Sequence, residues 1–396
     1  MLSFAKRITR RALQVAGVLG VGAALAACAP TGLGRAGPGI GPQIDPAQPV
    51  QVALLVPGDT GNADLDWLGR SLANSARMAA ADARGARIDL RVYKTTPSEA
   101  SAVSTAEQAA AEGAKIILGP LFAESANAVG KAVKDNNLNV LSFSNNPDIA
   151  GGNVYVLGNT FQNVADRLVS YGVRQGLRRF LMIYENDPAG QIGAGAIQSA
   201  IARNGATLTG RQQHALSQEG IDAVIPAISA AAKSGQIDAI FMTANQQAVL
   251  PYLTDKLYAA GVTSRTAQMM GLTRWDTPAA RLQLPGVQGG WFALPDTALQ
   301  SQFTARYRSA YGEAPHELGS LGYDGVAAIA ALVGSGNKNA VNTAGLTRSA
   351  GFSGVNGVFR LRANGTNERG MAIATINNGR VVVIDPAPRS FGGFGF

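Results

Sequence analysis

Short apolar runs alternate with amphipathic stretches along most of the chain, and residues 115–146 give the clearest example. Lys115–Leu118 contains a short apolar run that ends at Gly119 and Pro120, which is typical of a buried strand. The next apolar residues recur at spacings of four, three and four, which predicts one face of a helix: Phe122, Ala126, Val129 and Val133. Val140–Phe143 predicts a second strand. Because a helix joins two parallel strands, their carboxyl ends lie at one edge of a sheet, where ligands of open α/β sheets bind.

The same alternation predicts two sets of β-α units, and therefore an α/β fold with two doubly wound lobes. Besides residues 115–118 and 140–143, strands are expected at residues 51–56, 88–93, 154–157, 180–184, 206–211, 237–243 and 287–294. Helices are expected at residues 68–79, 98–112, 161–175, 190–204, 221–234, 246–260, 297–311 and 319–333. Three further apolar runs predict a C-terminal β-meander at residues 355–361, 371–376 and 381–384.

The first 27 residues have the pattern of a secretory signal peptide. Four basic residues precede an apolar stretch at residues 12–25, which is too short to span a bilayer as a helix. The stretch ends in Leu25-Ala26-Ala27-Cys28, which resembles a bacterial lipobox and predicts lipidation of Cys28. This is the only cysteine, so no internal disulfide is possible. Thr9-Arg10-Arg11 partly resembles a twin-arginine signal; ordinary secretion is favoured, and the route stays open.

Residues 28–49 are rich in Pro and Gly and show no apolar period, which predicts a tether. About 20 residues reach about 65 Å when extended and about 25 Å as a flexible coil. Residues 386–396 also lack a period and are expected to be disordered. Removal of the signal peptide takes away four positive charges and no negative ones, which lowers the net charge from +8 to +4. Because Lys and Arg are scattered, neither nucleic acid nor a polyanion is an expected partner.

The sequence contains no catalytic or metal-binding pattern. His214 and His316 lie 102 residues apart, and neither is near a cysteine or an acidic cluster. Gly58 and Gly61 lack the Lys-Ser/Thr of a phosphate loop, and there is no Gly-x-Ser-x-Gly elbow. We therefore expect no enzyme activity, no cofactor and no bound metal.

The loops that follow the two strands of residues 115–146 predict a ligand site. Gly119 permits close backbone approach, and free N–H groups at the start of the following helix favour an anion. The hydroxyls of Ser142 and Ser144 and the amide of Asn145 can hydrogen-bond a carboxylate. The alternative interpretation is that these loops are only a strand end and a turn. Both interpretations stay open.

Together these features resemble a type I periplasmic binding protein of the leucine-binding class, over residues 50–385. The resemblance rests on the lipobox, the two β-α lobes, the Gly119-Pro120 strand end, the Ser142–Asn145 loop and the late Gly322-Tyr323-Asp324. It implies that the chain crosses between the lobes three times. Residues 50–158 and 295–340 would then form the first lobe, and residues 159–294 and 341–385 the second.

A closer resemblance is to the periplasmic-binding-like domain of lipoproteins that activate penicillin-binding proteins. It rests on Gly119-Pro120-Leu121, residues 271–275 and the glycine-rich residues 351–379, which predict strands joined by tight turns. The larger activators carry an additional N-terminal helical repeat domain, whereas only the tether precedes the first strand here. The resemblance implies a lipid-anchored envelope protein that activates a penicillin-binding protein in peptidoglycan synthesis. Because Ala29 follows Cys28, it also implies an anchor in the outer membrane.

The alternative function is that of a solute receptor, which delivers an amino-acid-like small molecule to the permease of an ABC importer. Candidate ligand residues on the second lobe are Tyr184, Asn186, Thr243, Asn245, Arg274 and Trp275. Amino-acid binders of this class hold the ligand ammonium with a second-lobe carboxylate, but residues 243–247 offer none; Asp59 or Asp187 could replace it. A buried, unpaired ammonium is costly, which argues against ordinary amino acids. Tyr323 begins an expected helix, where a capping role is favoured over a ligand contact.

Overall fold

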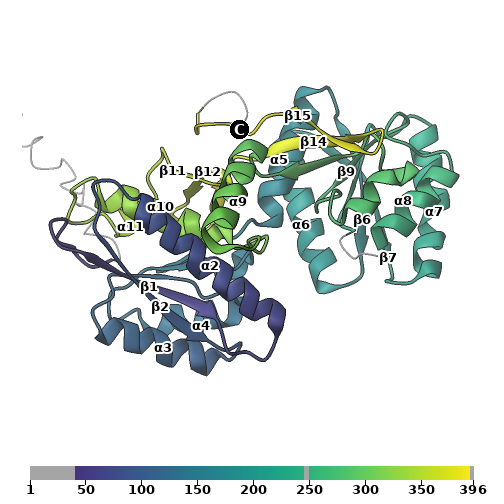
Figure 1. Cartoon of the computed structure of the whole chain (residues 1–396). Helices are drawn as coiled ribbons and strands as arrows, with labels where there is room; N and C mark the ends of the chain where they lie inside the picture. The colour runs from purple at the N-terminus through teal and green to yellow at the C-terminus, as the bar shows by residue number, and fades with distance from the viewer. Residues whose placement is uncertain (1–40, 245–248, 393–396) are drawn as a thin grey trace, which may run out of the picture. The chain divides into compact units, whose positions relative to one another are not determined.

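The computed structural model describes residues 41–244 and 249–392. They belong to one compact unit, and their strands form three sheets (Figure 1). The predicted signal peptide, Cys28, most of the tether and Asn245 lie outside the described residues. Within the two described ranges, no helix has both the length and the apolar character needed to cross a bilayer.

The first lobe is a parallel five-stranded sheet with helices on both faces, which confirms the prediction. The strand order is β2-β1-β3-β4-β5. These strands are β1 (Val50–Pro57), β2 (Ile88–Thr95), β3 (Ile116–Leu118), β4 (Val140–Ser142) and β5 (Val154–Val156). One face is covered by α2 (Ala63–Asp82) and α10 (Ser320–Val333), the other by α3 (Glu99–Ala111) and α4 (Ala123–Ala132). Because both faces are covered, all eight residues of β1 are buried.

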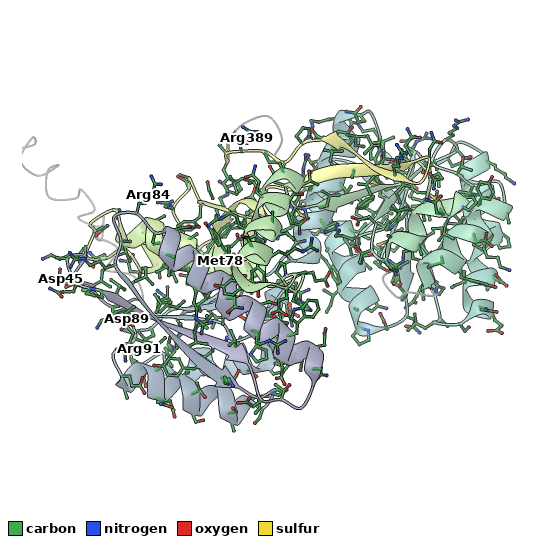
Figure 2. All side chains as sticks on the ribbon, in the orientation of Figure 1. Asp45, Met78, Arg84, Asp89, Arg91 and Arg389 are labelled. Atoms are coloured by element: carbon green, nitrogen blue, oxygen red, sulfur yellow. The ribbon has the colours of Figure 1, made fainter. Side chains whose placement is uncertain are left out.

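The outer edge of this sheet carries charged side chains. β2 is the edge strand, and Asp89 and Arg91 on it form an ion pair of 3.0 Å. Both residues lie at the surface (Figure 2). Charges on an edge strand discourage pairing with a strand of another chain.

The second lobe is a seven-stranded sheet in the order β15-β14-β10-β9-β8-β6-β7. Its parallel strands are β6 (Arg179–Glu185), β7 (Thr207–His214), β8 (Ala239–Met242), β9 (Gln268–Gly271) and β10 (Trp291–Leu294). The helices α5 (Phe161–Arg174) and α6 (Pro188–Arg203) pack on one face, and α7 (Gln218–Lys233) and α8 (Val249–Ala259) on the other. A further helix, α9 (Thr297–Tyr311), returns to the first lobe and packs on α2. The doubly wound second lobe is also confirmed.

Two strands near residue 280 differ from the expectation. β9 was not predicted, because its four residues follow a polar stretch and give too short an apolar run. The strand expected at residues 287–294 begins only at Trp291. The reason is that Pro285–Val287 forms a 3-10 turn, and Gly289 adopts a positive φ of 76° before the strand starts.

The expected C-terminal meander is divided between two sheets. β11 (Phe352–Gly354), β12 (Gly357–Leu361) and β13 (Asn367–Arg369) form a separate antiparallel sheet, whereas β14 (Ala372–Asn377) and β15 (Arg380–Asp385) extend the second-lobe sheet. Apolar burial explains the division. Phe352, Phe359 and Leu361 join the first-lobe core, while Ile373 and Ile376 join the second-lobe core. The side chains of residues 341–361 thus pack on the first lobe, although the expected boundary assigns them to the second.

Both ends of the described chain are packed where the sequence predicted loose segments. Gly41 exchanges two hydrogen bonds with the Asn137 side chain, of 3.0 and 2.9 Å, and Ile44 is buried in the first-lobe core. Residues 41–49 are therefore not part of a free tether. At the other end, the centroid of the Phe391 ring lies 4.4 Å from the guanidinium carbon of Arg360, so this residue of the expected disordered tail packs on the folded domain. Composition alone missed these contacts because the partners are distant in sequence.

Candidate functional site

A cavity of ≈ 640 Å³ lies between the two lobes. Its walls come from the ends of β3 and β4 in the first lobe, from the end of β9 in the second, and from the segments that connect the lobes. The first-lobe loops that the sequence singled out meet here, because Leu121, Ser144 and Asn145 all line the cavity. Carboxyl ends of parallel strands meet at one edge of a sheet, which is why these loops converge.

Three chain segments connect the lobes beside the cavity: residues 157–160 after β5, residues 295–296 after β10, and residues 370–371 after β13. The first and third are tied together by side chains of β13. The Asn367 amide donates to the carbonyl oxygens of Val156 (2.8 Å) and Gly158 (2.7 Å), and Arg369 Nε donates to that of Leu157 (3.2 Å). The first and third connecting segments are thus joined by hydrogen bonds at the base of the cavity, and we call them the hinge.

A buried ion pair fixes the hinge to the first lobe. Arg369 Nη1 donates to Asp324 Oδ2 on α10 at 3.1 Å, and both side chains are buried. The other oxygen of Asp324 accepts from the backbone N–H of Val355 at 2.8 Å. Tyr323 lies one residue away, but α10 begins at Ser320, so Tyr323 does not cap it. Its hydroxyl instead donates to Asp82 at 2.7 Å, and it does not line the cavity.

Gly119 and Ser142 shape the first-lobe wall from behind. Gly119 has a φ of +96°, and a Cβ at this position would meet the Leu55 carbonyl oxygen at 2.1 Å, so only glycine fits. The buried Ser142 hydroxyl donates to the Pro120 carbonyl oxygen (3.0 Å) and accepts from the Ser144 N–H (3.1 Å). Gly119, Pro120 and Ser142 are therefore absent from the cavity lining and hold the two loops together.

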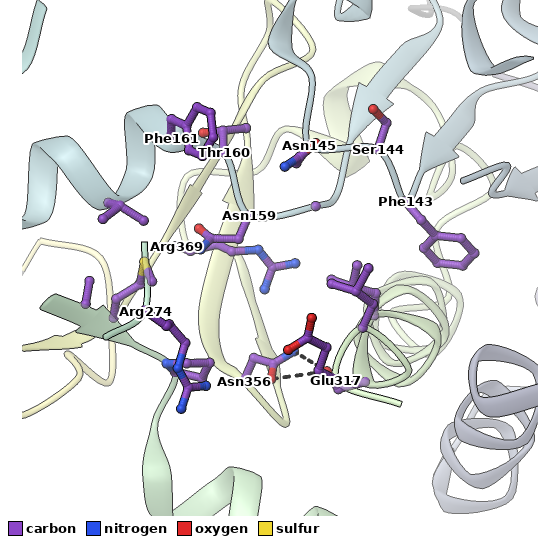
Figure 3. Close-up of a pocket in the computed structure, with 18 of the residues that line it drawn as sticks. Phe143, Ser144, Asn145, Asn159, Thr160, Phe161, Arg274, Glu317, Asn356 and Arg369 are labelled. Atoms are coloured by element: carbon purple, nitrogen blue, oxygen red, sulfur yellow. Dashed lines mark hydrogen bonds between the residues drawn. The ribbon is translucent and has the colours of Figure 1, made fainter. Parts of the chain in front are cut away.

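Two groups of this wall remain available to a ligand. The Ser144 oxygen accepts from the Asn146 N–H at 3.1 Å, which leaves its hydroxyl hydrogen to donate. The exposed Asn145 amide projects into the cavity (Figure 3). Phe122, the N-cap residue of α4, and Ala123, its first residue, also line the cavity, and no side chain caps this helix N-terminus. The wall thus offers polar donors beside the positive end of a helix dipole.

Three charged residues line the cavity: Arg274, Glu317 and Arg369 (Figure 3). Arg274 forms a two-pronged ion pair with Asp276, with Nε to Oδ1 at 2.8 Å, and this contact raises the pKa of Arg274, with a smaller contribution from the charge of Glu317. Arg369 is paired with Asp324. Glu317 is exposed and has no hydrogen-bond or ion-pair partner among the residues that the structure describes. It is therefore the uncompensated charge of this lining.

Most of the second-lobe candidates lie away from the cavity. Arg274 lines it, but Trp275 is fully buried against Gly271 and Gly290. Tyr184 is half-buried on β6, Thr243 donates to the buried Glu185, and Asn186 accepts from Gln213 at 2.9 Å. Asn245 is not described. The sheet order explains this, because β9 and β10 border the hinge whereas β6 and β8 lie farther along the sheet.

Of the two acidic residues that could replace a second-lobe carboxylate, neither lines the cavity. Asp59 pairs with Lys94 at 3.0 Å on the exposed surface, and Asp187 caps α6 by accepting from the Gly190 N–H at 2.6 Å. Four residues of the lining were not predicted from the sequence. Glu317 precedes α10, and Arg369 lies within the glycine-rich C-terminal motif. Asn159 and Thr160 lie in a connecting segment, which the pattern of strands and helices does not indicate.

The described residues contain no group of three or more His, Cys, Asp or Glu side chains placed to hold a metal ion. The chemistry of the cavity is that of a binding site, with apolar walls, hydrogen-bond donors and one free carboxylate.

Comparison with solved structures gives the same fold at low sequence identity. A Rhodospirillum rubrum protein, provisionally assigned to branched-chain amino acid ABC transporters, matches with a TM-score of 0.72, 18% identity, and coverage of 85% of this chain and 100% of that one. A periplasmic ligand-binding protein of a branched-chain amino acid ABC transporter from Burkholderia xenovorans LB400 matches with a TM-score of 0.68 and 16% identity, and the match covers 87% of this chain and 97% of that one. An ABC transporter substrate-binding protein from Desulfitobacterium hafniense in complex with Leu matches with a TM-score of 0.60 and 18% identity, and the match covers 85% of this chain and 100% of that one.

Among curated proteins, an uncharacterized protein of Rickettsia prowazekii (strain Madrid E) is 25% identical over 122 residues, which is 31% of this chain. The chain thus spans about a third of that relative, or 32% of its length. The profile described as "Periplasmic binding protein" matches residues 49–380, nearly the whole of both lobes. The chain therefore belongs to the periplasmic binding protein family, which implies a periplasmic location.

Proposed function

We propose that this protein is a solute receptor, which captures a small molecule between its lobes for the permease of an ABC importer. The observation that supports the proposal is the cavity itself. Its volume of ≈ 640 Å³ is within the range of about 300–1,000 Å³ for small-molecule sites, and both lobes contribute to its walls. A ligand that touches both lobes binds the closed state more tightly than the open one, and so drives closure about the hinge.

The cavity has the composition expected for such a site. Apolar side chains cover much of it, among them Leu121, Phe143, Phe161, Leu272 and Met371. Polar groups are few and converge from the first-lobe loops and the connecting segments. An apolar pocket with a small number of fixed polar groups is the usual architecture for small-molecule recognition.

The lipid anchor of Cys28 is part of the same proposal, whereas its place in the outer membrane belongs to the activator hypothesis, because the permease of an importer lies in the inner membrane. They rest on the lipobox and on Ala29 in the sequence. The activation of a penicillin-binding protein stays a hypothesis. The glycines that suggested it have a structural explanation here, since a Cβ on Gly354 would meet the Asp324 carboxylate at 2.1 Å and Gly357 has a φ of +114°. Those glycines are required by the hinge sheet, whatever the partner.

The experiment is a binding screen of residues 29–396, which lack the signal peptide and Cys28. A variant whose cavity is filled by a large side chain serves as the comparison. Asn145→Trp places an indole in the cavity from an exposed position, so the fold should survive. Asn136→Trp is the matched control, because Asn136 is equally exposed but lies between α4 and β4, at the opposite edge of the first sheet.

We expect a small solute to raise the melting temperature and decrease the radius of gyration of the wild-type protein and of Asn136→Trp, but not of Asn145→Trp. Equal responses from both variants would place binding elsewhere and remove the argument for a receptor. If no solute binds and the protein stimulates glycan polymerisation by a purified penicillin-binding protein, the activator hypothesis takes its place.

A further inference from the structure

The loop before α10 holds Glu317 at the cavity wall in a fixed position. The His316 backbone N–H donates to the Ser71 hydroxyl at 3.0 Å, and the imidazole Nδ1 accepts from the Leu318 N–H at 3.1 Å. The His316 ring packs edge-on against Trp67, with ring centroids 4.9 Å apart. His316 is therefore anchored to α2 and Leu318 is bonded to His316, and the Glu317 carboxylate between them faces the cavity (Figure 3).

The positive charges of the cavity are already engaged, whereas this carboxylate is not. Arg274 is bound by Asp276 through two nitrogens, and Arg369 divides its donors between Asp324 and the Leu157 carbonyl oxygen. In the open cleft, water solvates Glu317. Closure removes that water, and a desolvated carboxylate is costly unless a cation and hydrogen-bond donors meet it.

The donors left for an anionic group of a solute are the uncapped N-terminus of α4, neutral side chains and one arginine nitrogen. The Ser144 N–H already donates to the Ser142 hydroxyl. Among the side-chain nitrogens of Arg274 and Arg369, only Nη1 of Arg274 has no hydrogen bond within the described structure. The Asn145 amide and the Ser144 hydroxyl are neutral donors, which bind a carboxylate less strongly than an ionised partner does. The cavity thus offers a full negative charge to a positive group, but only neutral donors, a helix dipole and one arginine nitrogen to a negative group.

We propose that the cavity selects an organic cation, whose ammonium or guanidinium group pairs with Glu317 and which needs no carboxylate. This rests on the proposed receptor function and assigns its solute class. The apolar part of the solute contacts Leu121, Phe143 and Leu321, which line the cavity from the same lobe as Glu317. The positive group is therefore held by the first lobe, whereas the resemblance to amino-acid binders implies a partner on the second.

A competing possibility is that Arg274 itself meets Glu317 when the lobes close. The two charges have opposite signs and attract each other, although the raised pKa of Arg274 comes mainly from its hydrogen bond to Asp276 and only to a small extent from Glu317. Such a contact would close the cleft without a solute. Arg274→Gln separates the two cases: it should weaken a direct contact between the lobes, but should leave a solute cation bound to Glu317 or strengthen it, because a competing positive charge is removed.

The test measures binding by calorimetry on residues 29–396. It uses three compounds that share the same branched hydrocarbon group. They are leucine, its decarboxylated amine 3-methylbutylamine, and its deaminated acid 4-methylpentanoate, together with choline and agmatine as further cations. The variants are Glu317→Gln and, as the matched control, Glu313→Gln, because Glu313 is exposed in the same loop but does not line the cavity.

We expect at least one of the three cations to bind, and 3-methylbutylamine to bind more tightly than the acid and no more weakly than leucine. Glu317→Gln should weaken the best cation about tenfold to hundredfold, the usual effect of losing a charged hydrogen bond, and Glu313→Gln should not. Unchanged melting temperatures of the solute-free variants would show that both fold.

Tight binding of leucine that Glu317→Gln leaves unchanged would overturn the cation proposal and keep the receptor function. Preference for the acid would do the same. Closure of the solute-free protein that Arg274→Gln and Glu317→Gln both abolish, with no cation bound, would assign the pair to a direct contact instead. If no compound of this panel or of the wider screen binds, both the cation class and the receptor function are refuted.

Discussion

The buried ion pair of the hinge allows a quantitative prediction. Asp324 has no exposed side-chain surface, and the side chain of Arg369 is 7% exposed. The Asp324 carboxylate accepts from Arg369 Nη1 at 3.1 Å, from the Val355 N–H at 2.8 Å and from the Asn356 amide at 3.1 Å. Asp324→Ala removes all three contacts at once and leaves the guanidinium buried without a carboxylate.

Loss of one partner of a buried ion pair costs about 3–5 kcal/mol, because the remaining charge is uncompensated. Arg369 keeps its hydrogen bonds to the Leu157 carbonyl oxygen, so we expect the lower end, about 3 kcal/mol in the free energy of unfolding. Asp324→Asn retains an acceptor for the Val355 N–H, but its amide NH2 replaces the oxygen that accepts from Arg369 and Asn356, so donors face donors. We therefore expect a cost similar to that of Asp324→Ala, about 3 kcal/mol.

Urea unfolding followed by circular dichroism measures both values, and a double-mutant cycle with Arg369→Met tests the cause. If the pair acts as a unit, the double variant should lose less free energy of unfolding than the two single variants lose together, by at least about 1 kcal/mol. A cost below about 1 kcal/mol for Asp324→Ala, or strict additivity, would refute the assignment of the hinge to this pair.

Three further changes test other parts of the molecule. Cys28→Ser should release the protein from membranes, and retention of the variant after a high-salt wash would contradict the lipid anchor. Truncation after residue 385 removes the contact of Phe391 with Arg360 and should destabilise the protein by about 1 kcal/mol, with faster hydrogen exchange in β12; unchanged exchange would show that the segment is dispensable. Asp238→Asn tests a pH effect: hydrogen bonding to Arg179 lowers the pKa of Asp238 from 3.8 to about 2, so its stabilising effect is complete above about pH 4 and is lost as the pH falls towards 2. Because this pair is partly exposed, we expect a cost of at most about 1 kcal/mol at pH 7, and a cost that persists at pH 2 would contradict the assignment.

The fold was largely predictable because buried parallel strands and amphipathic helices leave strong local patterns. The residues of β1 and β3 are apolar runs closed by breakers, and each was identified. β9 was missed because its pairing with β8 and β10 is non-local, and four residues carry little pattern of their own. The packing of residues 41–49 was missed for the same reason: the Gly41 contact with Asn137 spans 96 residues.

The candidate site was predictable on one side only. Leu121, Ser144 and Asn145 follow adjacent strands of one β-α-β unit, so sequence order placed them together. Second-lobe candidates at the ends of β6 and β8 required the order of strands in the sheet, which the sequence does not contain. Glu317 and Arg369 were beyond reach because no local pattern distinguishes a loop carboxylate or a hinge arginine from a surface charge.

Two kinds of protein could be built on this fold, and they depend on different residues. A solute receptor depends on the cavity, hence on Asn145 and Glu317, which are exposed there and stabilise nothing else in the described structure. An activator of a synthase depends on an outer surface and does not need a free carboxylate inside a cleft. A charged side chain that is held at a cavity wall by an anchored loop, without a partner of its own, is explained by a ligand. The position of Glu317 therefore favours the receptor.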